Sequence, residues 1–223
     1  MKQYSWSDPP GQFAFPVEKA GYPVILACAF ITAVFALLEL TYPAIIGIIV
    51  TLSICFFFRD PDRIIPNGAG IVVSPADGKI LYVSKTDSQH FYEGPCIKIS
   101  IFMSVFNVHV NRVPHEGEIK KIRYFPGKFV SANLDKASLE NEHNAVFLET
   151  EEGFQVCFVQ VAGLIARRII CKVQKGDFLL RGQRFGLICF GSRLDVYLPA
   201  DFQPEVSAGD KVLAGASILG KLI

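Results

Sequence analysis

The chain has 223 residues, enough for one domain of moderate size and an appendage. Its 22 basic and 21 acidic residues nearly cancel, which gives no support for a nucleic-acid-binding protein. The six cysteines include no C-x-x-C pair, so their spacing indicates neither a zinc site nor a disulfide framework. We expect reduced cysteines that act as small apolar side chains, and no metal.

Two long apolar runs lie near the N-terminus. Residues 20–38 and 40–58 are each 19 residues long, carry no charge and are separated by Glu39. As helices they would each measure roughly 28 Å, close to the hydrocarbon thickness of about 30 Å. The break at 39–43 contains a carboxylate, a tyrosine and a proline, which suit a turn at a membrane surface. We therefore expect a transmembrane helical hairpin within residues 1–63; the alternative is a pair of buried core helices.

The charges that flank these runs predict their orientation. Lys2 and Lys19 precede the first run, Arg59 and Arg63 follow the second, and the turn between them has no basic residue. Positive charge on both outer flanks places both ends on the cytoplasmic side of a membrane. We expect a protein of the cell membrane whose remaining residues, 64–223, form a domain on the cytoplasmic side.

Residues 64–223 have the pattern of a mainly β (α+β) domain. Short β-rich runs alternate with Gly, Pro, Asp and Asn turns, which is typical of a barrel or sandwich. The expected strands are 70–74, 78–84, 96–101, 117–125, 145–149, 154–160, 168–173, 184–190, 195–198 and 217–222. Residues 129–140 are ambiguous between helix and loop.

A weak internal repeat occurs in this domain. Residues 173–182 and 206–215 both read V-x-x-G-D-x-x-L-x-G. A Gly-Asp turn followed closely by a second glycine is typical of a hairpin. The pattern resembles the turns of lipoyl- and biotinyl-type barrel-sandwich domains, and we expect the two copies to be pseudo-symmetric halves of one barrel.

Four polar segments are candidates for a functional site. They are residues 74–79 with Asp77, 102–114 with His109, 133–144 with His143, and 190–199 with Gly191-Ser192. Taken singly, each has an ordinary structural interpretation: a turn, a buried histidine in the core, a solvated loop and a common dipeptide.

Together and in this order, the four segments resemble the phosphatidylserine decarboxylase family, most closely its short, membrane-anchored form. The resemblance covers nearly the whole chain, including the N-terminal apolar runs. Its motifs here are F-R-D-P-D-R at 58–63, A-D-G at 76–78, F-N-V-H-V-N-R at 106–112, and F-G-S-R at 190–193 followed by D-V-Y-L-P at 195–199.

The resemblance implies a decarboxylase that makes its own cofactor. Loss of CO2 from an α-amino acid leaves a carbanion, and no ordinary side chain is an adequate electron sink. The family implies that Ser192 attacks the Gly191 carbonyl, cuts the chain and becomes a pyruvoyl group. The large (β) fragment, 1–191, and the small (α) fragment, 192–223, would form a heterodimer, and a higher oligomer stays open. The implied reaction converts phosphatidylserine to phosphatidylethanolamine and CO2, without a metal.

The resemblance also implies roles for individual residues. Asp77 is the expected base or orienting group for self-cleavage, and His109 is expected to assist decarboxylation and protonate the carbanion. Longer members have a second histidine that pairs with the aspartate, where this chain has Arg112. His143 either replaces that partner or binds the head group, and Asn111 and Arg112 are expected to contact the substrate.

Two alternatives remain open from the sequence. A non-enzymatic, membrane-anchored barrel-sandwich adaptor would share the hairpin and the repeat, but gives no reason for the Gly191-Ser192 motif. An ether-lipid analogue such as archaetidylserine carries the same serine head group, and no residue pattern distinguishes the lipid tails.

Overall fold

The computed structural model describes residues 16–87, 90–130, 140–163, 168–189 and 191–223. The described residues divide into two compact units, one that ends at Asp62 and one that runs from Arg63 to Ile223. Each unit is described by itself below. Residues 131–139, which contain most of the ambiguous segment 129–140 and of the polar segment 133–144, lie outside the described residues, as does Phe190.

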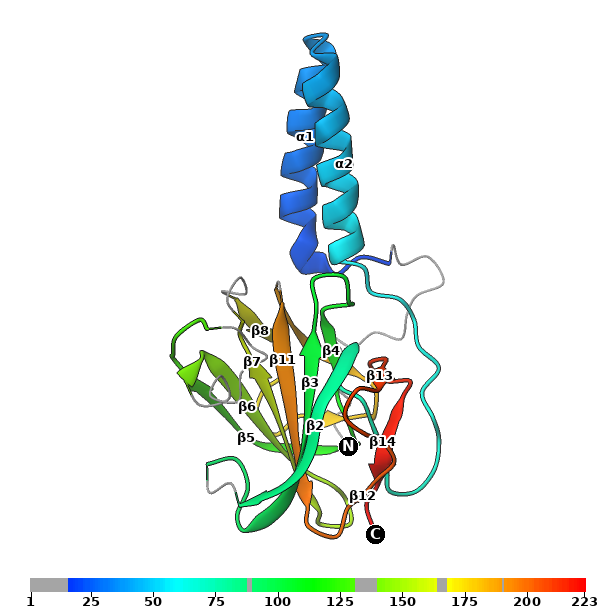
Figure 1. The fold of residues 1–223 in the computed structure, drawn as a ribbon, viewed down its shortest axis with the longest axis vertical. Helices are drawn as coiled ribbons and strands as arrows, with labels where there is room; N and C mark the ends of the chain where they lie inside the picture. The colour runs from blue at the N-terminus through cyan, green and yellow to red at the C-terminus, as the bar shows by residue number, and fades with distance from the viewer. Residues whose placement is uncertain (1–15, 88–89, 131–139, 164–167, 190) are drawn as a thin grey trace. The chain divides into compact units, whose positions relative to one another are not determined.

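The N-terminal unit is a pair of apolar helices (Figure 1). A 3-10 turn, Lys19–Gly21, leads into α1 (Tyr22–Leu37), and α2 follows at Thr41–Phe57. Together, the 19 residues Lys19–Leu37 are long and apolar enough to cross a membrane, whereas α2 is an apolar helix of 17 residues. The expected spans, 20–38 and 40–58, match these helices closely.

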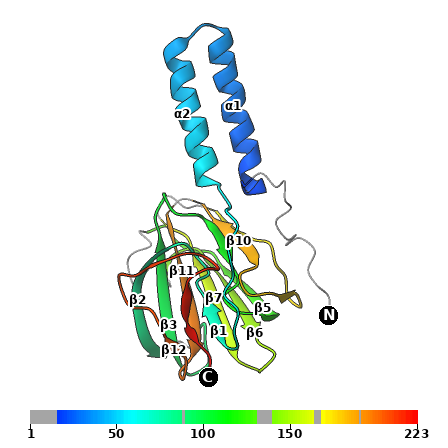
Figure 2. The same ribbon diagram turned by 90° about the vertical axis from the view of Figure 1, so that its right-hand side faces the viewer.

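Small and hydroxylated side chains lie where α1 and α2 pack side by side (Figures 1 and 2). The hydroxyls of Thr32 and Thr51 are 3.5 Å apart, and each also donates to a carbonyl one turn earlier in its own helix. A Cβ at Gly47 would lie 2.5 Å from the Thr32 hydroxyl, so glycine allows this close approach. Interfaces of small residues are typical of helix pairs in membranes, where apolar burial gives little driving force.

The second unit is built on a curled antiparallel sheet of eight strands (Figure 1). Their spatial order is β13 (Lys211–Val212), β2 (Gly78–Asp87), β3 (Pro95–Met103), β11 (Ser192–Pro199), β7 (Gln155–Val161), β6 (His143–Glu149), β5 (Gly117–Phe125) and β9 (Phe178–Leu179). Strand β11, near the C-terminus in sequence, lies in the middle and pairs with β3 and β7.

Two small antiparallel sheets complete this unit. One has the order β4 (Val110–Arg112), β10 (Arg184–Ile188) and β8 (Ile169–Cys171), and the other β1 (Ile71–Val73), β14 (Ile218–Lys221) and β12 (Gln203–Pro204). The mainly β prediction is confirmed, and each of the ten expected strands overlaps an observed one. The strands that were not expected, β4, β9, β12 and β13, are two or three residues long, too short to show an alternating pattern.

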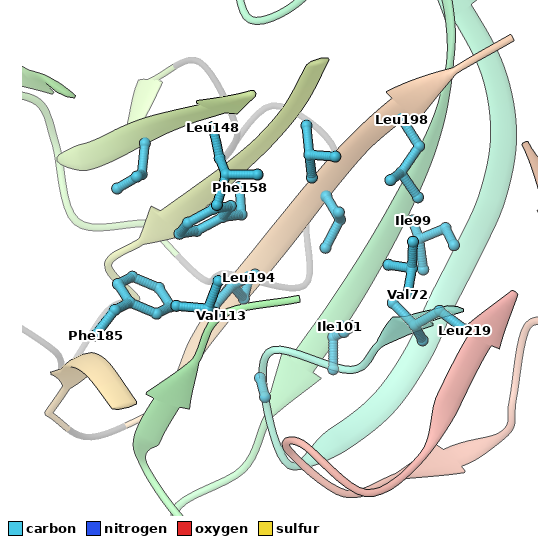
Figure 3. Packing of buried hydrophobic residues seen from close by; sticks show 14 of the residues in the cluster. Val72, Ile99, Ile101, Val113, Leu148, Phe158, Phe185, Leu194, Leu198 and Leu219 are labelled. Atoms are coloured by element: carbon cyan, nitrogen blue, oxygen red, sulfur yellow. The ribbon is translucent and has the colours of Figure 1, made fainter. Parts of the chain in front are cut away.

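The main core lies between the large sheet and the two small ones (Figure 3). Leu194 of β11 and Phe158 of β7 face Val113 and Phe185, and all four side chains are completely buried. A second apolar cluster covers the other face of the large sheet and includes Tyr197. The middle of this sheet is therefore buried on both faces, which is unusual for an antiparallel sheet and explains why β11 lacks exposed positions.

The two V-x-x-G-D-x-x-L-x-G segments form turns of the same construction. The Asp177 carboxylate accepts a hydrogen bond of 2.7 Å from the backbone N–H of Gln174, and Asp210 accepts one of 2.8 Å from Ser207. Each is an aspartate that bonds the backbone three residues earlier and so closes its own turn. The repeated sequence therefore encodes a repeated local structure.

The last glycines of the two repeats also make equivalent contacts. Gly182 donates to the Val113 carbonyl and Gly215 to the Ser74 carbonyl, at 2.8 and 2.7 Å. Both have φ of 74°, a left-handed conformation that favours glycine. A Cβ at Gly215 would lie 3.6 Å from the Gly182 Cα, and Ile65 packs against both glycines. The two halves therefore meet at these residues.

The same symmetry relates two further segments. Residues 74–80 read S-P-A-D-G-K-I and residues 113–119 read V-P-H-E-G-E-I, and these are the segments to which the two glycines donate. Glu116 therefore corresponds to Asp77. Glu116 pairs with Arg181, with N–O distances of 2.9 and 3.0 Å. Each half thus carries a carboxylate directly before a strand of the large sheet.

Candidate active site

Ser192 begins the central strand β11 and is completely buried. It lies opposite Met103 at the end of β3, and its hydroxyl is 3.4 Å from the Met103 sulfur. The preceding residue, Gly191, has φ of 59°, in the left-handed region where a side chain is strained by about 1–2 kcal/mol. The Gly191–Ser192 bond is therefore a sharp turn into a rigid strand, a setting in which glycine is required for conformational reasons.

A chain of buried polar side chains continues from Met103. Asn111 donates from Nδ2 to the Met103 sulfur at 3.6 Å and accepts at Oδ1 from Gln160 Nε2 at 2.9 Å. Gln160 in turn accepts at Oε1 from Asn144 Nδ2 at 3.2 Å. These amides are at most 3% exposed. Strands β3, β4, β7 and β6 thus bring polar groups from four separate segments to the side of the sheet that Ser192 faces.

Asp77 lies at the same end of the sheet as Ser192. It directly precedes β2, whose Lys79 pairs with Phe102, the neighbour of Met103 on β3. Two strand spacings, roughly 10 Å, therefore separate the backbones of Asp77 and Ser192. The Asp77 carboxylate accepts from the backbone N–H of Ala214 at 2.7 Å and forms an ion pair of 2.9 Å with Arg63.

The ion pair with Arg63 is an unexpected part of this site. From the sequence, Arg63 was expected only as one of the basic residues that flank the second apolar run. Here Arg63 is the first residue of the β unit, and its guanidinium is 16% exposed beside the 5% exposed side chain of Asp77. Such burial leaves the pair less screened than a surface pair, so Arg63 helps to hold the Asp77 carboxylate in place.

Arg112 lies beside the Asp77 turn. Its backbone N–H donates to the Pro75 carbonyl at 2.9 Å, and its guanidinium donates to the Gly182 carbonyl at 3.0 Å. Its aliphatic part packs against Gly215. Arg112, which occupies the position of the second histidine of longer family members, is therefore buried where the two repeats meet.

His109 directly precedes β4 and is 1% exposed. The pairing of β4 with β10 extends to His109, because the Ile188 N–H donates to the His109 carbonyl at 3.4 Å. Side chains two positions apart in an extended ladder point to the same side. His109 therefore points to the side on which Asn111 contacts Met103, which brings it to the Ser192 side of the sheet.

His143 has a different environment. Val161 of β7 pairs with Arg193 on one side and with His143 on the other. Because side chains alternate along a strand, His143 shares the face of Arg193, opposite to that of Ser192. Its ring stacks on Phe125 with centroids 4.6 Å apart, and its Nδ1 lies 2.6 Å from the Asn141 carbonyl. This placement favours a packing role over the catalytic one.

Burial lowers the pKa of His143 below its ordinary value, and the hydrogen bond to the Asn141 carbonyl opposes this shift. A lowered pKa in the folded state means that folding favours the neutral ring. We expect the stability that depends on neutral His143 to be complete above the ordinary histidine pKa and to be lost as the pH falls through the lowered one. Thermal unfolding of the full chain in detergent between about pH 7.5 and about pH 5 measures this loss.

The His143→Phe variant keeps an aromatic ring at this position and removes the titrating group. We expect its unfolding temperature to fall less on acidification than that of the unsubstituted chain. A His90→Gln variant removes an exposed histidine whose charge is only the smallest cause of the lowered His143 pKa, so it serves as the control and should retain most of the decline. Equal declines in all three proteins would exclude His143 as the source.

A pocket of about 270 Å³ lies elsewhere on this unit. It is lined by residues 90–93 and by side chains that include Lys121, Phe147 and Cys157. Lys121, Phe147 and Cys157 lie opposite one another on neighbouring strands, and Cys157 lies opposite Tyr197 of β11. The Tyr197 side chain points to the same face of the sheet as Arg193. The pocket is therefore on the face opposite Ser192 and is separate from the candidate site.

The family assignment follows from comparison with known proteins. The model that describes phosphatidylserine decarboxylase matches residues 50–220. The chain belongs to this family. A phosphatidylserine decarboxylase proenzyme of Geotalea uraniireducens is 52% identical over 207 residues, which cover 93% of this chain and 97% of the relative. Proteins of the same name from Desulfotalea psychrophila and Cupriavidus metallidurans are each 50% identical over 93% and 92% of this chain, and over 97% and 95% of their own lengths.

Four of the residues expected from the sequence come together in this member of the phosphatidylserine decarboxylase family. Asn111 and His109 lie on the side of the large sheet that Ser192 faces, and Asp77 lies at the same end of the sheet as Ser192. Met103 and Gln160 were not among the residues expected from the sequence. Gln160 has a recognisable signal, because it is a lone amide on the core side of an otherwise apolar strand. Met103 has none, since a methionine next to an apolar strand is ordinary core sequence.

Proposed function

We propose that this chain is a phosphatidylserine decarboxylase that cuts itself between Gly191 and Ser192 and releases CO2 from the serine head group of its lipid. The observation that carries the proposal is the position of the family's Gly-Ser motif. Ser192 is buried at the start of the central strand, and Gly191 forms the left-handed turn before it. An adaptor would have no use for a buried serine at such a turn.

The proposed self-cleavage begins with an exchange of acyl bonds. Ser192 Oγ attacks the Gly191 carbonyl carbon, the C–N bond breaks, and the hydroxyl proton ends on the nitrogen of residue 192. Loss of the Cα proton then breaks the Cβ–Oγ bond and leaves Gly191 as a carboxylate and residue 192 as dehydroalanine. Tautomerisation and addition of water release ammonia and leave a ketone, the pyruvoyl group.

The site fits a pyruvoyl group at position 192. The contact of Ser192 with the Met103 thioether is one that a methyl group can also make. When present, this group supplies the electron sink that decarboxylation of an amino acid requires. Within the described part of the chain, no group of three or more His, Cys, Asp or Glu side chains lies close enough to hold a metal ion.

We assign the roles of base and orienting group for self-cleavage to Asp77, with Arg63 holding its carboxylate in place. The carboxylate can accept the Ser192 proton through a short relay, since both lie at the same end of the sheet. Asn111 and Arg112 are the proposed contacts for the phosphate and carboxylate of the head group. Buried His109 is the proposed acid that returns a proton to the substrate carbon.

His109→Gln should separate the two reactions. Because its proposed role lies in turnover, the variant should still form fragments 1–191 and 192–223. Its decarboxylation rate at saturating lipid should fall by about 10²-fold or more, the usual contribution of a general acid. Release of labelled CO2 from purified, fully processed protein measures this rate, and a rate within a factor of about two of the unsubstituted enzyme would remove His109 from the mechanism.

The membrane anchor completes the proposal. We propose that the apolar helices within residues 1–63 form a transmembrane hairpin, with the catalytic domain, 64–223, on the cytoplasmic side of the cell membrane. The length of Lys19–Leu37 and the Thr32–Gly47 contact between the helices support an intramembrane pair. A diacyl lipid does not leave a bilayer readily, so an anchored site meets its substrate at a higher local concentration.

Mass spectrometry of the purified full-length chain tests the proposed function. We expect a fragment ending at Gly191 and a fragment 192–223 that has a blocked N-terminus and reacts with carbonyl reagents. Phosphatidylserine in mixed micelles should yield phosphatidylethanolamine and CO2 in equal amounts. A single uncut chain with no carbonyl group and no CO2 release would overturn the proposal.

A further inference from the structure

We propose that Gln160 is a positioning residue for self-cleavage and acts on Ser192 through Asn111 and Met103. The inference rests on the proposed function, since it concerns how the Ser192 hydroxyl is held for its attack on the Gly191 carbonyl. Ser192, Met103, Asn111, Gln160 and Asn144 are called the Ser192 network below.

The cost of burying Gln160 indicates that it has a specific task. It lies among apolar side chains on β7, with Phe158 and Val156 beside it on the same face of the strand. A buried amide without partners is destabilising, and an apolar residue here would continue the core. Gln160 instead has both ends of its amide bonded, to Asn111 and to Asn144.

These bonds give the network a direction. Gln160 donates to Asn111 Oδ1, so Nδ2 is the end of the Asn111 amide that is left to face Met103. The Met103 sulfur then lies between two donors, the Asn111 amide at 3.6 Å and the Ser192 hydroxyl at 3.4 Å. Gln160 thereby determines that the Met103 sulfur, which accepts from the Ser192 hydroxyl, also faces the Asn111 N–H group rather than its carbonyl oxygen.

A thioether suits the hydroxyl before cleavage. Sulfur is a weak acceptor, so it holds the orientation of the Ser192 O–H and is too weak a base to take its proton. The oxygen lone pairs stay available for the bond to the Gly191 carbon. A carbonyl oxygen in the same place would bind the hydroxyl strongly and oppose its rotation toward Gly191.

The same thioether suits the product. When the Cβ–Oγ bond breaks, Oγ leaves as part of the Gly191 carboxylate and Cβ becomes a methyl carbon. Met103 packs against a methyl group without losing a strong hydrogen bond, whereas a buried amide or carboxylate would be left without its partner. Met103 is therefore compatible with both chemical states of residue 192.

The Gln160→Glu variant tests the direction of the network. At a pH at which residue 160 is ionised, its carboxylate still accepts from Asn144 but cannot donate, so Asn111 must turn its Nδ2 toward residue 160 and its Oδ1 toward Met103. We expect self-cleavage, followed by gel during cell-free synthesis into detergent, to slow by tenfold or more. Gln155→Glu places the same change at an exposed position of the same strand and should cleave at the unsubstituted rate.

Hydroxylamine identifies the step that is affected. It cleaves esters and leaves amides intact. If Ser192 is poorly placed for the first attack, no ester accumulates and hydroxylamine does not restore cleavage of the Gln160→Glu chain. Restoration to the unsubstituted rate would put the defect after ester formation and overturn the proposed role.

Met103→Leu supplies an independent measurement if the Gln160→Glu chain does not fold. Leucine removes the sulfur acceptor at similar volume and introduces no buried polar group. We expect cleavage to slow severalfold.

Cleavage of both variants at the unsubstituted rate would overturn the inference while leaving the proposed function intact. Failure of the unsubstituted chain to cleave would overturn both.

Discussion

Replacing Ser192 with alanine should leave the chain uncut and abolish decarboxylation of phosphatidylserine. The variant lacks the oxygen that attacks Gly191 and the atom whose departure leads to the ketone, so neither fragment nor electron sink can form. The expected loss of activity is complete within the sensitivity of a labelled-CO2 assay. Gel and intact-mass measurements on the same sample should show one chain of full length.

The effect should be chemical rather than structural. The described contact of the Ser192 hydroxyl is with a weak acceptor, Met103, so its removal costs little stability. The thermal unfolding temperature should therefore change little. Ser207→Ala removes an exposed hydroxyl at a repeat turn and should be cut and fully active. Wild-type CO2 release from uncut Ser192→Ala protein would mean that the reaction does not depend on a group made from this residue.

Replacing Asp77 with asparagine should slow self-cleavage by about 10²–10⁴-fold, the range expected for loss of a general base. Asparagine keeps the shape and can still accept from the Ala214 N–H, but it loses the charge that pairs with Arg63. The measurement is the rate at which fragment 192–223 appears during cell-free synthesis. Arg63→Gln should slow cleavage less, because it leaves the carboxylate present and removes only its ion-pair partner.

Glu116→Gln is the matched control for Asp77→Asn. Glu116 occupies the equivalent position in the other half of the pseudo-symmetric unit and is also paired with an arginine, Arg181. Its substitution removes an ion pair of the same kind at a position that is not at the Ser192 end of β3. Cleavage should proceed at the unsubstituted rate. If both variants were slowed equally, the role of Asp77 would be structural.

The repeated contacts also show where the two halves of the domain differ. Both halves have a Gly-Asp turn, a left-handed glycine and a carboxylate beside an arginine. Of the two carboxylates, Asp77 precedes the strand that pairs with β3, and β3 in turn pairs with the strand of Ser192. The position of β11 in the sheet thus distinguishes two otherwise similar carboxylates.

The sequence by itself determined the helices, most of the strands and the family. Each follows from information contained in a short window: charge-free runs of spanning length, alternating apolar residues, and strings such as F-N-V-H-V-N-R. The repeat was visible for the same reason, although its S-P-A-D-G and V-P-H-E-G segments became recognisable as counterparts only through their contacts with Gly215 and Gly182.

Tertiary structure alone decided which polar groups meet. Met103, Asn111, Gln160 and Asn144 come from four strands, and the register between strands puts them on the side of Ser192 while placing His143 on the other. A shift of one residue in any pairing would reverse these faces. Pairing register depends on contacts between residues far apart in the chain, and for this reason local sequence pointed to Ser192 but did not reveal the side chains around it.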